Sequence, residues 1–134
     1  MANRLMKQFT MTLEAGVCKL FGEVVTSTSG TIASQSCKGF TVTKTGSETG
    51  RYTVTLADKY MKLLNVGVCV VGAADAAYGS GKGLMSFIRN DSIASNGTTF
   101  NVQFVDAATP QADAELEDGA KFKIEITLKN STAY

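Results

Sequence analysis

Residues 79–83 are the stretch of the chain that comes closest to a phosphate-binding loop. They read Gly-Ser-Gly-Lys-Gly. In a P-loop, glycines let backbone N–H groups surround the phosphates, a lysine contacts them, and a following Ser or Thr holds Mg²⁺. Here Ala76 occupies the first glycine position and Gly83 the hydroxyl position. Because no long helix pattern follows to point its N-terminus at a phosphate, we expect a loop between strands and no nucleotide site.

Residues 113–119 hold the densest group of carboxylates, the side chains that Ca²⁺ prefers. They read Asp-Ala-Glu-Leu-Glu-Asp-Gly. An EF-hand loop needs flanking helices and a bidentate Glu at its twelfth position, and Ile124 stands at that position in this chain. The pattern therefore predicts no metal and no other cofactor, with a weak, irregular calcium site left open as an alternative.

The chain contains no histidine. This removes Ser-His-Asp and Cys-His nucleophiles, the commonest metal ligand and the usual proton carrier at neutral pH. The twelve Asp and Glu residues leave a carboxylate pair for glycoside hydrolysis open, although the chain has no tryptophan to stack against a sugar. We therefore predict that the protein is not an enzyme.

The three cysteines, Cys18, Cys37 and Cys69, stand far apart in the sequence. An odd number without a Cys-x-x-C spacing argues against a disulfide framework and against a zinc site. Cys18 and Cys69 lie in apolar, strand-like segments, where a thiol packs as a small hydrophobe. We expect all three thiols to be buried, reduced and dispensable for folding.

Apolar and polar residues alternate with a period of two along much of the chain. The clearest case is the segment 121–129, and the segments 9–13, 40–43, 51–56 and 99–104 repeat it. This period is typical of a strand with one buried and one solvated face. The predicted core consists of Tyr52, Val54, Leu56, Phe100, Phe104, Phe122, Ile124, Ile126 and Leu128.

Turn residues separate these segments at the spacing of antiparallel hairpins. Residues 46–50 contain two glycines and join the segment 40–45 to the segment 51–56. The dipeptide Asn96-Gly97, which favours positive φ in tight turns, comes just before the segment 98–106. The sequence therefore predicts hairpin-connected strands.

One segment departs from the period of two. In residues 58–64, Tyr60, Leu63 and Leu64 fall at i, i+3 and i+4, and Asp58 stands where an N-cap would be. This spacing predicts a helix of one or two turns.

About eight strands and one short helix predict an all-β fold. A chain of 134 residues is near the usual size of a single domain and buries enough surface to be stable without metal or disulfides. We predict one antiparallel β-sandwich or jelly-roll-like domain over residues 1–134, with one short helix near residues 58–64 and residues 1–8 as an extended N-terminal arm.

The charges argue against two classes of partner. A net charge of +1 gives no overall attraction to nucleic acid or to acidic lipid.

No apolar signal-peptide core follows the basic residues 1–8, and the weakly polar run 66–74 is far shorter than the roughly 20 residues of a membrane-spanning helix. We expect a soluble protein, made in a cytoplasm, with neither a nucleic-acid nor a membrane partner.

Several segments together resemble a known group of proteins. They are residues 1–9 (MANRLMKQF), 13–17 (LEAGV), 19–22 (KLFG), 50–64 (GRYTVTLADKYMKLL) and 124–131 (IEITLKNS). In these segments the chain resembles small structural proteins of bacteriophage virions, with capsid decoration or cement proteins as the best fit. The segments 27–36 and 73–82 carry none of the resemblance.

The resemblance implies a structural part of a tailed-phage particle. Such decoration proteins are small, rich in β-structure and often trimeric, and they bind where capsid subunits meet. It therefore implies a homo-oligomer, with a trimer favoured, whose partner is the major capsid protein or another virion protein. The alternatives left open are a tail, neck or fibre-associated virion protein and a host-surface binding module.

A virion protein of this kind attaches through its surface, and the sequence offers two candidate contact segments. The residues 2–8 combine apolar with basic side chains ahead of the first alternating segment, and the span 106–118 holds five acids and no base. The candidate interface residues are Arg4, Leu5, Met6, Lys7, Asp113, Glu115 and Glu117. We expect the acidic span to face basic groups of a neighbouring subunit.

Overall fold

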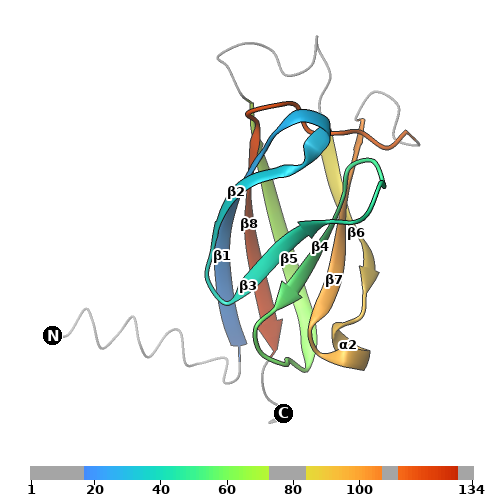
Figure 1. Cartoon of the computed structure of the whole chain (residues 1–134). Helices are drawn as coiled ribbons and strands as arrows, with labels where there is room; N and C mark the ends of the chain where they lie inside the picture. The colour runs from blue at the N-terminus through green and yellow to red at the C-terminus, as the bar shows by residue number, and fades with distance from the viewer. Residues whose placement is uncertain (1–16, 73–83, 107–111, 130–134) are drawn as a thin grey trace, which may run out of the picture.

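The computed structural model describes residues 17–72, 84–106 and 112–129, which form two antiparallel sheets packed face to face (Figure 1). The strands of the β8 sheet, in spatial order, are β2 (Ile32–Cys37), β1 (Val17–Thr26), β8 (Lys121–Lys129) and β5 (Lys62–Val71). Those of the β7 sheet are β3 (Phe40–Lys44), β4 (Arg51–Leu56), β7 (Thr99–Asp106) and β6 (Leu84–Asp91). The predicted antiparallel β-sandwich is confirmed.

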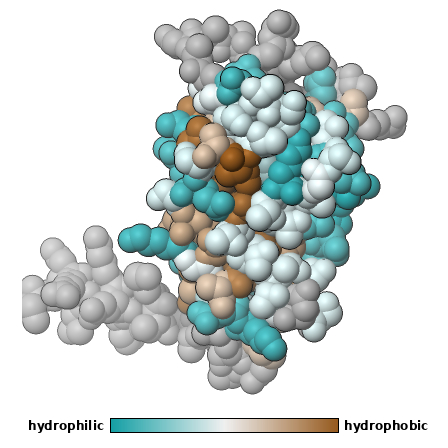
Figure 2. Space-filling view, in the orientation of Figure 1, coloured by the Kyte–Doolittle hydropathy of each residue, from teal (hydrophilic) through white to brown (hydrophobic). Residues whose placement is uncertain are grey.

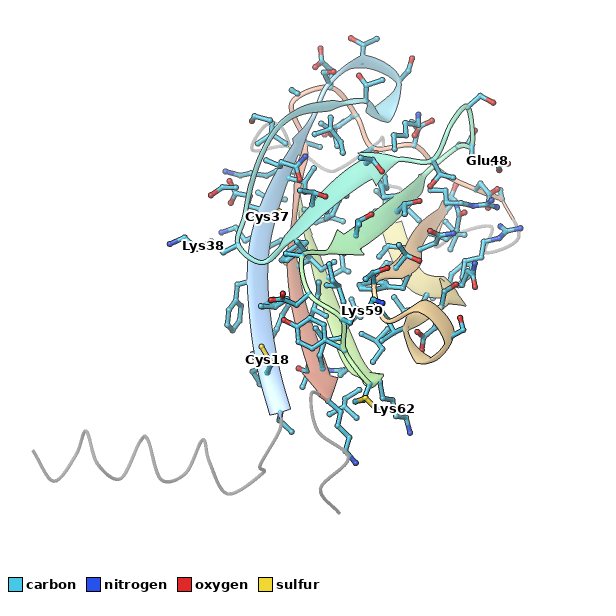
Figure 3. All side chains as sticks on the ribbon, turned by 60° about the horizontal axis from the view of Figure 1, so that its bottom comes forward. Cys18, Cys37, Lys38, Glu48, Lys59 and Lys62 are labelled. Carbon is cyan, nitrogen blue, oxygen red and sulfur yellow. The ribbon has the colours of Figure 1, made fainter. Side chains whose placement is uncertain are left out.

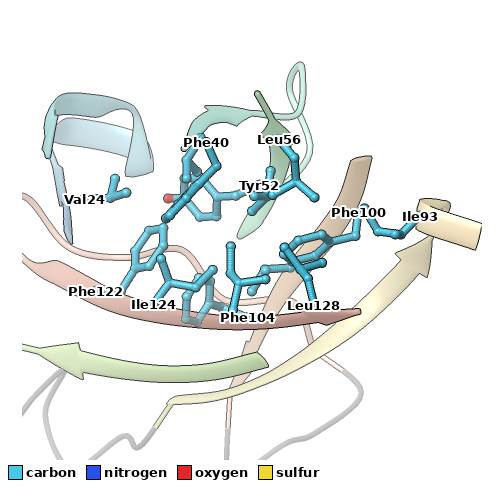
Figure 4. Packing of buried hydrophobic residues seen from close by; sticks show 14 of the residues in the cluster. Val24, Phe40, Tyr52, Leu56, Ile93, Phe100, Phe104, Phe122, Ile124 and Leu128 are labelled. Carbon is cyan, nitrogen blue, oxygen red and sulfur yellow. The ribbon is translucent and has the colours of Figure 1, made fainter. Parts of the chain in front are cut away.

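The core lies between the two sheets and contains all nine residues that the alternation predicts. At its centre Phe122 from β8 meets Tyr52 from β4 and Phe104 from β7 (Figure 4). The three ring centroids are 5.3–5.8 Å apart and the rings are tilted or edge-on, which is the preferred aromatic geometry. The one polar atom among them is satisfied, because the Tyr52 hydroxyl donates to the Gly30 carbonyl at 2.6 Å.

The predicted hairpin is also confirmed. β3 and β4 pair from Phe40 with Leu56 to Lys44 with Tyr52, and the turn between them uses Gly46 and Gly50 at positive φ. At Gly50 a side chain would meet the Ala114 carbonyl oxygen at 2.1 Å, so both the backbone angle and the space require glycine.

The helix predicted near residues 58–64 is wrong. Residues 57–61 form an irregular connection, held by hydrogen bonds from Tyr60 N to the Gly97 carbonyl (2.9 Å) and from Met61 N to the Lys129 carbonyl (2.8 Å), and β5 comes next. A bulge in β5 shifts its register between Leu63 and Asn65. Because a bulge adds one residue to a strand, it breaks the period of two and imitates helical spacing.

The helical structure of the described chain lies elsewhere. One 3-10 turn, η1, spans Thr28–Gly30, and one turn of α-helix, α2, spans Ile93–Asn96. Gly97 ends α2 with φ at +78°, as expected for the residue after a helix. Ile93 at the start of α2 is buried in the core, so α2 covers one end of the sandwich (Figure 1).

The two sides of the sandwich differ. On one side the short turn at residues 38–39 leads from β2 in one sheet directly to β3 in the other. On the opposite side the edge strands β5 and β6 lie at the ends of their sheets. The inward-facing apolar residues there are only partly buried: Leu63, Val66, Val68, Val70, Leu84 and Ile88. At the β2–β3 side Ile32 and Cys37 of β2 are likewise only partly buried, but Phe40 and Val42 of β3 are buried. Among the described residues, the core is therefore more open at the β5–β6 side, which is called the open side below.

We predict that Gly22→Ala weakens the fold while Gly67→Ala does not. A Cβ at Gly22 would lie 2.6 Å from both Cys37 Sγ and Phe40 Cζ, whereas a Cβ at Gly67 has no neighbour closer than Glu125 Cβ at 4.0 Å. Overpacking of this kind costs about 1–3 kcal/mol. Urea unfolding checks it, and equal midpoints for the two variants would contradict the packing at Gly22.

Candidate functional site

The structure separates the sequence-predicted interface residues into three groups. Arg4, Leu5, Met6 and Lys7 lie outside the described residues, as does the arm 1–8. Asp113 and Glu117 are exposed, and Asp113 forms a single backbone bridge with Val105. Glu115 is half-buried and engaged within the chain.

Glu115 holds three parts of the sandwich together. Its Oε1 lies 2.8 Å from Lys44 Nζ at the end of β3 and accepts a hydrogen bond from Gly50 N at 3.0 Å. Lys44 Nζ also donates to the Ser29 carbonyl in η1. With both side chains mostly buried, at 15% and 27% exposed, the pair is less screened than a surface ion pair. In this chain Glu115 therefore satisfies groups of its own fold.

The three cysteines are free, as predicted, but they are not all buried. Cys18 and Cys37 are half-buried, whereas Cys69 is exposed on the outer face of β5. Burial raises the pKa of the Cys37 thiol, and its contact with the Glu23 carbonyl offsets part of that effect. Burial, and next the nearby Cys18, likewise raise the pKa of Tyr60, whose Oη is 4.0 Å from Cys18 Sγ.

Large exposed apolar side chains were missed by the sequence analysis. They are Phe21, Met61, Leu64, Met85 and Phe87, each 44–60% exposed. Phe21 stands in β1 among outward-facing Lys19 and Glu23, which was the signal available in the sequence. β6 likewise carries apolar residues at both odd and even positions. Both faces of this strand therefore present apolar side chains, which a neighbouring element normally buries.

Four of these five side chains lie on or beside the edge strands of the open side, in both sheets. Leu64 lies on β5, Met61 directly precedes it, and Met85 and Phe87 lie on β6. The face seen in Figure 2 has β2 and β3 in front and is mostly hydrophilic, with apolar surface in small patches. Since large exposed apolar groups mark interaction surfaces when a partner can cover them together, and since β5 and β6 are edge strands, the β5–β6 side is the candidate binding surface.

A hollow of about 650 Å³ on the outer face of the β8 sheet adjoins this surface. Phe21, Lys38, Gly67, Cys69 and Glu125 are among the residues that line it. The acidic groups of this face have partners within the chain: Glu125 with Lys19 at 3.1 Å, and Glu23 with Lys121 and Lys123 at 3.9 and 3.8 Å. Figure 3 shows Lys38 extending from the β2–β3 turn away from the sheets.

The described part of the chain brings no three His, Cys, Asp or Glu side chains together in a way that could hold a metal ion. None of its helices has the length and apolar character needed to span a membrane. Every buried side-chain nitrogen and oxygen in these residues has a hydrogen-bond partner. Gln103, fully buried, for example donates from Nε2 to the Thr49 and Phe104 carbonyls.

Comparisons with protein-family models, with curated proteins and with solved structures found no match to this chain. A function for this chain is therefore inferred from its own residues and from the geometry of the sandwich.

We predict that a maleimide labels Cys69 at least tenfold faster than Cys37 at pH 8. Cys69 is exposed, while Cys37 is half-buried with a raised pKa, and only the thiolate reacts. Peptide mass spectrometry over a labelling time course measures both rates in one sample. Equal rates in folded protein, with equal rates also in urea, would contradict the arrangement.

We predict that Glu115→Ala lowers the free energy of unfolding by about 1–3 kcal/mol, because Lys44 and Gly50 N then lose a charged acceptor. Asp113→Ala is the matched control, since Asp113 is an exposed acid of the same segment, and it should stay within about 0.5 kcal/mol of the wild type. If both variants unfold at the wild-type urea midpoint, Glu115 is not a structural residue.

Proposed function

We propose that this chain is a non-catalytic structural protein of a tailed-phage particle, which decorates the capsid and stabilises contacts between its subunits. In this proposal the protein is made in the host cytoplasm, forms a homo-oligomer and binds the major capsid protein. The observation that carries it is the presence of four large exposed apolar side chains on and beside the edge strands β5 and β6.

Such a surface suits a protein that works by contact area. A stable contact buries about 1,200–2,000 Å² in total, and apolar, aromatic and Met side chains are concentrated at its centre. Met61, Leu64, Met85 and Phe87 are side chains of these kinds. A chain without histidine also lacks the residue on which most acid–base catalysis at neutral pH depends.

The resemblance in residues 1–9, 13–17, 19–22, 50–64 and 124–131 supports a virion location. It rests on the residue pattern of these segments, whereas the surface argument rests on side-chain exposure; Met61 and Leu64 belong to both. The two lines agree on a compact, β-rich subunit that assembles with copies of itself and with a shell protein.

The acidic span contributes less to attachment than the sequence suggested. Glu115 is occupied by Lys44 and Gly50, so Asp113, which is exposed, is a predicted contact acid that a partner can reach. We propose the residues 2–7 as the second contact with the capsid, because Leu5 and Met6 are apolar groups that a partner could bury beside basic Arg4 and Lys7.

We predict that deleting residues 2–7 lowers occupancy on capsids at least tenfold and leaves the sandwich intact. Burying two apolar side chains contributes about 1.5–3 kcal/mol each, and about 1.4 kcal/mol is a factor of ten in affinity. Capsids lacking the protein are mixed with the wild type or the variant, and bound protein is quantified after sedimentation.

A chain that lacks residues 132–134 is the matched control, and circular dichroism verifies the fold of both variants. Imaging of reconstituted particles locates the protein. Density on the capsid surface supports the proposal, whereas density on a tail, neck or fibre, or binding only to host cells, replaces it with one of the alternatives.

A further inference from the structure

The open side of the sandwich presents two strand edges at once. Within residues 17–72, 84–106 and 112–129, β5 pairs only with β8 and β6 pairs only with β7. The residues 63–71 of β5 carry no charge and no proline. Native proteins normally protect an edge strand with charges, prolines, bulges or a covering element. The bulge of β5 lies only at its start, between Leu63 and Asn65, so the apolar edge beyond it is left for a partner.

The two edges run in opposite directions at matching heights. Two hollows lie along the seam between them: one is lined by Val68, Val70, Leu84 and Ser86, among others, and the next by Leu63, Val66 and Ile88. Residue numbers therefore rise along β5 as they fall along β6, with Val66 near the level of Ile88 and Val70 near the level of Leu84.

A rotation about an axis parallel to the strands keeps both the direction and the height of every strand. It therefore brings β6 of one copy beside β5 of the next in antiparallel orientation, with Val66 opposite Ile88 and Val70 opposite Leu84 of the neighbouring copy. We propose that copies of this chain assemble into a closed ring in which β5 of each copy pairs with β6 of its neighbour.

This register also matches the faces of the two strands. Cross-strand partners in a sheet point to the same side, so Met85 and Phe87, which pair with Val105 and Gln103, lie on the outer face of the β7 sheet. In the ring Met85 then stands opposite Cys69, and Phe87 opposite Gly67, both on the outer face of the β8 sheet. The outward-facing side chains of β5 therefore lie beside the outward-facing side chains of the neighbour's β6, and the core-facing side chains of the two strands likewise lie together.

Gly67 supplies a place for the neighbour's aromatic ring. A Cβ there would meet nothing closer than Glu125 Cβ at 4.0 Å, and the hollow of about 650 Å³ opens over it. Phe87 is 46% exposed within its own chain. An aromatic side chain laid over a glycine of a neighbouring strand is a known way to stabilise a sheet, so the two features complement one another.

The inward-facing residues of the seam become core in the ring. The partly buried Val66, Val68 and Val70 of one copy would continue against Leu84 and Ile88 of the next. The eight residues of β6 span about 26 Å, and two sheets about 10 Å apart with their side chains make a face of about 25 Å in width. Each copy thus buries on the order of 600 Å² over its two edges, and the smallest ring, of two copies, about 1,200 Å² in total, which is what a specific interface needs.

A second copy fits this surface better than an unrelated peptide does. A single added strand would cover one edge and leave the other, whereas the ring pairs both edges of every copy with one kind of contact. Closed rings built from one repeated contact are also the common form of homo-oligomers. The ring deepens the homo-oligomer part of the proposed function and does not require the capsid.

A native cysteine makes the pairing testable. Met85→Cys places a thiol opposite Cys69 of the neighbouring copy, so copper-phenanthroline oxidation of the full chain should convert most of it to covalent oligomers on a non-reducing gel. Met85→Cys combined with Cys69→Ser should lose at least nine-tenths of that product. Ser86→Cys is the matched control, because the neighbouring position faces the other side of the sheet.

Gly67→Arg provides a second test that does not depend on cysteine chemistry. The open space above Gly67 lets this variant fold as a single chain, but the larger side chain takes the place of Phe87 of the neighbour. We expect native circular dichroism and a monomer by light scattering where the wild type is an oligomer. A monomeric wild type, or equal cross-linking by Met85→Cys and Ser86→Cys, would overturn the ring. Because these measurements use purified protein, they separate its failure from a failure to bind capsids.

Discussion

The contact between one face of β8 and the facing sides of β4 and β7 is the interaction on which the rest of the structure depends. Phe122 from β8 packs against Tyr52 and Phe104, with ring centroids 5.3 Å away in both cases. These are three of the four largest side chains that are fully buried among the described residues, and burial of apolar area is the dominant favourable term in folding. The remaining strands pair, directly or through a neighbour, with β8 in one sheet or with β4 and β7 in the other.

The end of the sandwich that holds η1 and the β3–β4 turn is connected to this same contact by hydrogen bonds. The hydroxyl of Tyr52, whose ring is in the contact, donates to the Gly30 carbonyl in η1. Glu115 pairs with Lys44 and accepts a hydrogen bond from Gly50 N. Thr26 extends the arrangement, because its hydroxyl donates to the Glu117 and Ala120 carbonyls. A segment that looks acidic and solvated in the sequence is thus tied to the fold by its own backbone and by one carboxylate.

The opposite property governs the β5–β6 side. There the core side chains are only partly buried, and two strand edges have no partner among the described residues. Backbone groups at an edge are obligatory hydrogen-bonding groups that another strand can satisfy. The proposed self-association rests on this geometry, because the more open β5–β6 side leaves two edges on which strands of another copy can pair.

The amino-acid sequence by itself determined the fold class and the core. All nine predicted core residues are buried and the β3–β4 hairpin lies where its glycines placed it, because a period of two and a positive-φ turn are local properties that the chain carries in its residue types. The helix prediction failed because a bulge between Leu63 and Asn65 changes the period within one strand. The bulge is a feature of how β5 pairs with β8, which the local sequence does not show.

Only the tertiary structure decided which charges and apolar groups are accessible. Nothing local distinguishes Glu115 from Asp113, yet Glu115 lies beside Lys44, 71 positions earlier in the chain, and Asp113 does not. The exposure of Cys69, Met85 and Phe87 likewise follows from the position of β5 and β6 at the ends of their sheets. Strand order is set by packing between residues distant in sequence, so a sequence pattern states which face of a strand is apolar but not whether a neighbour covers it.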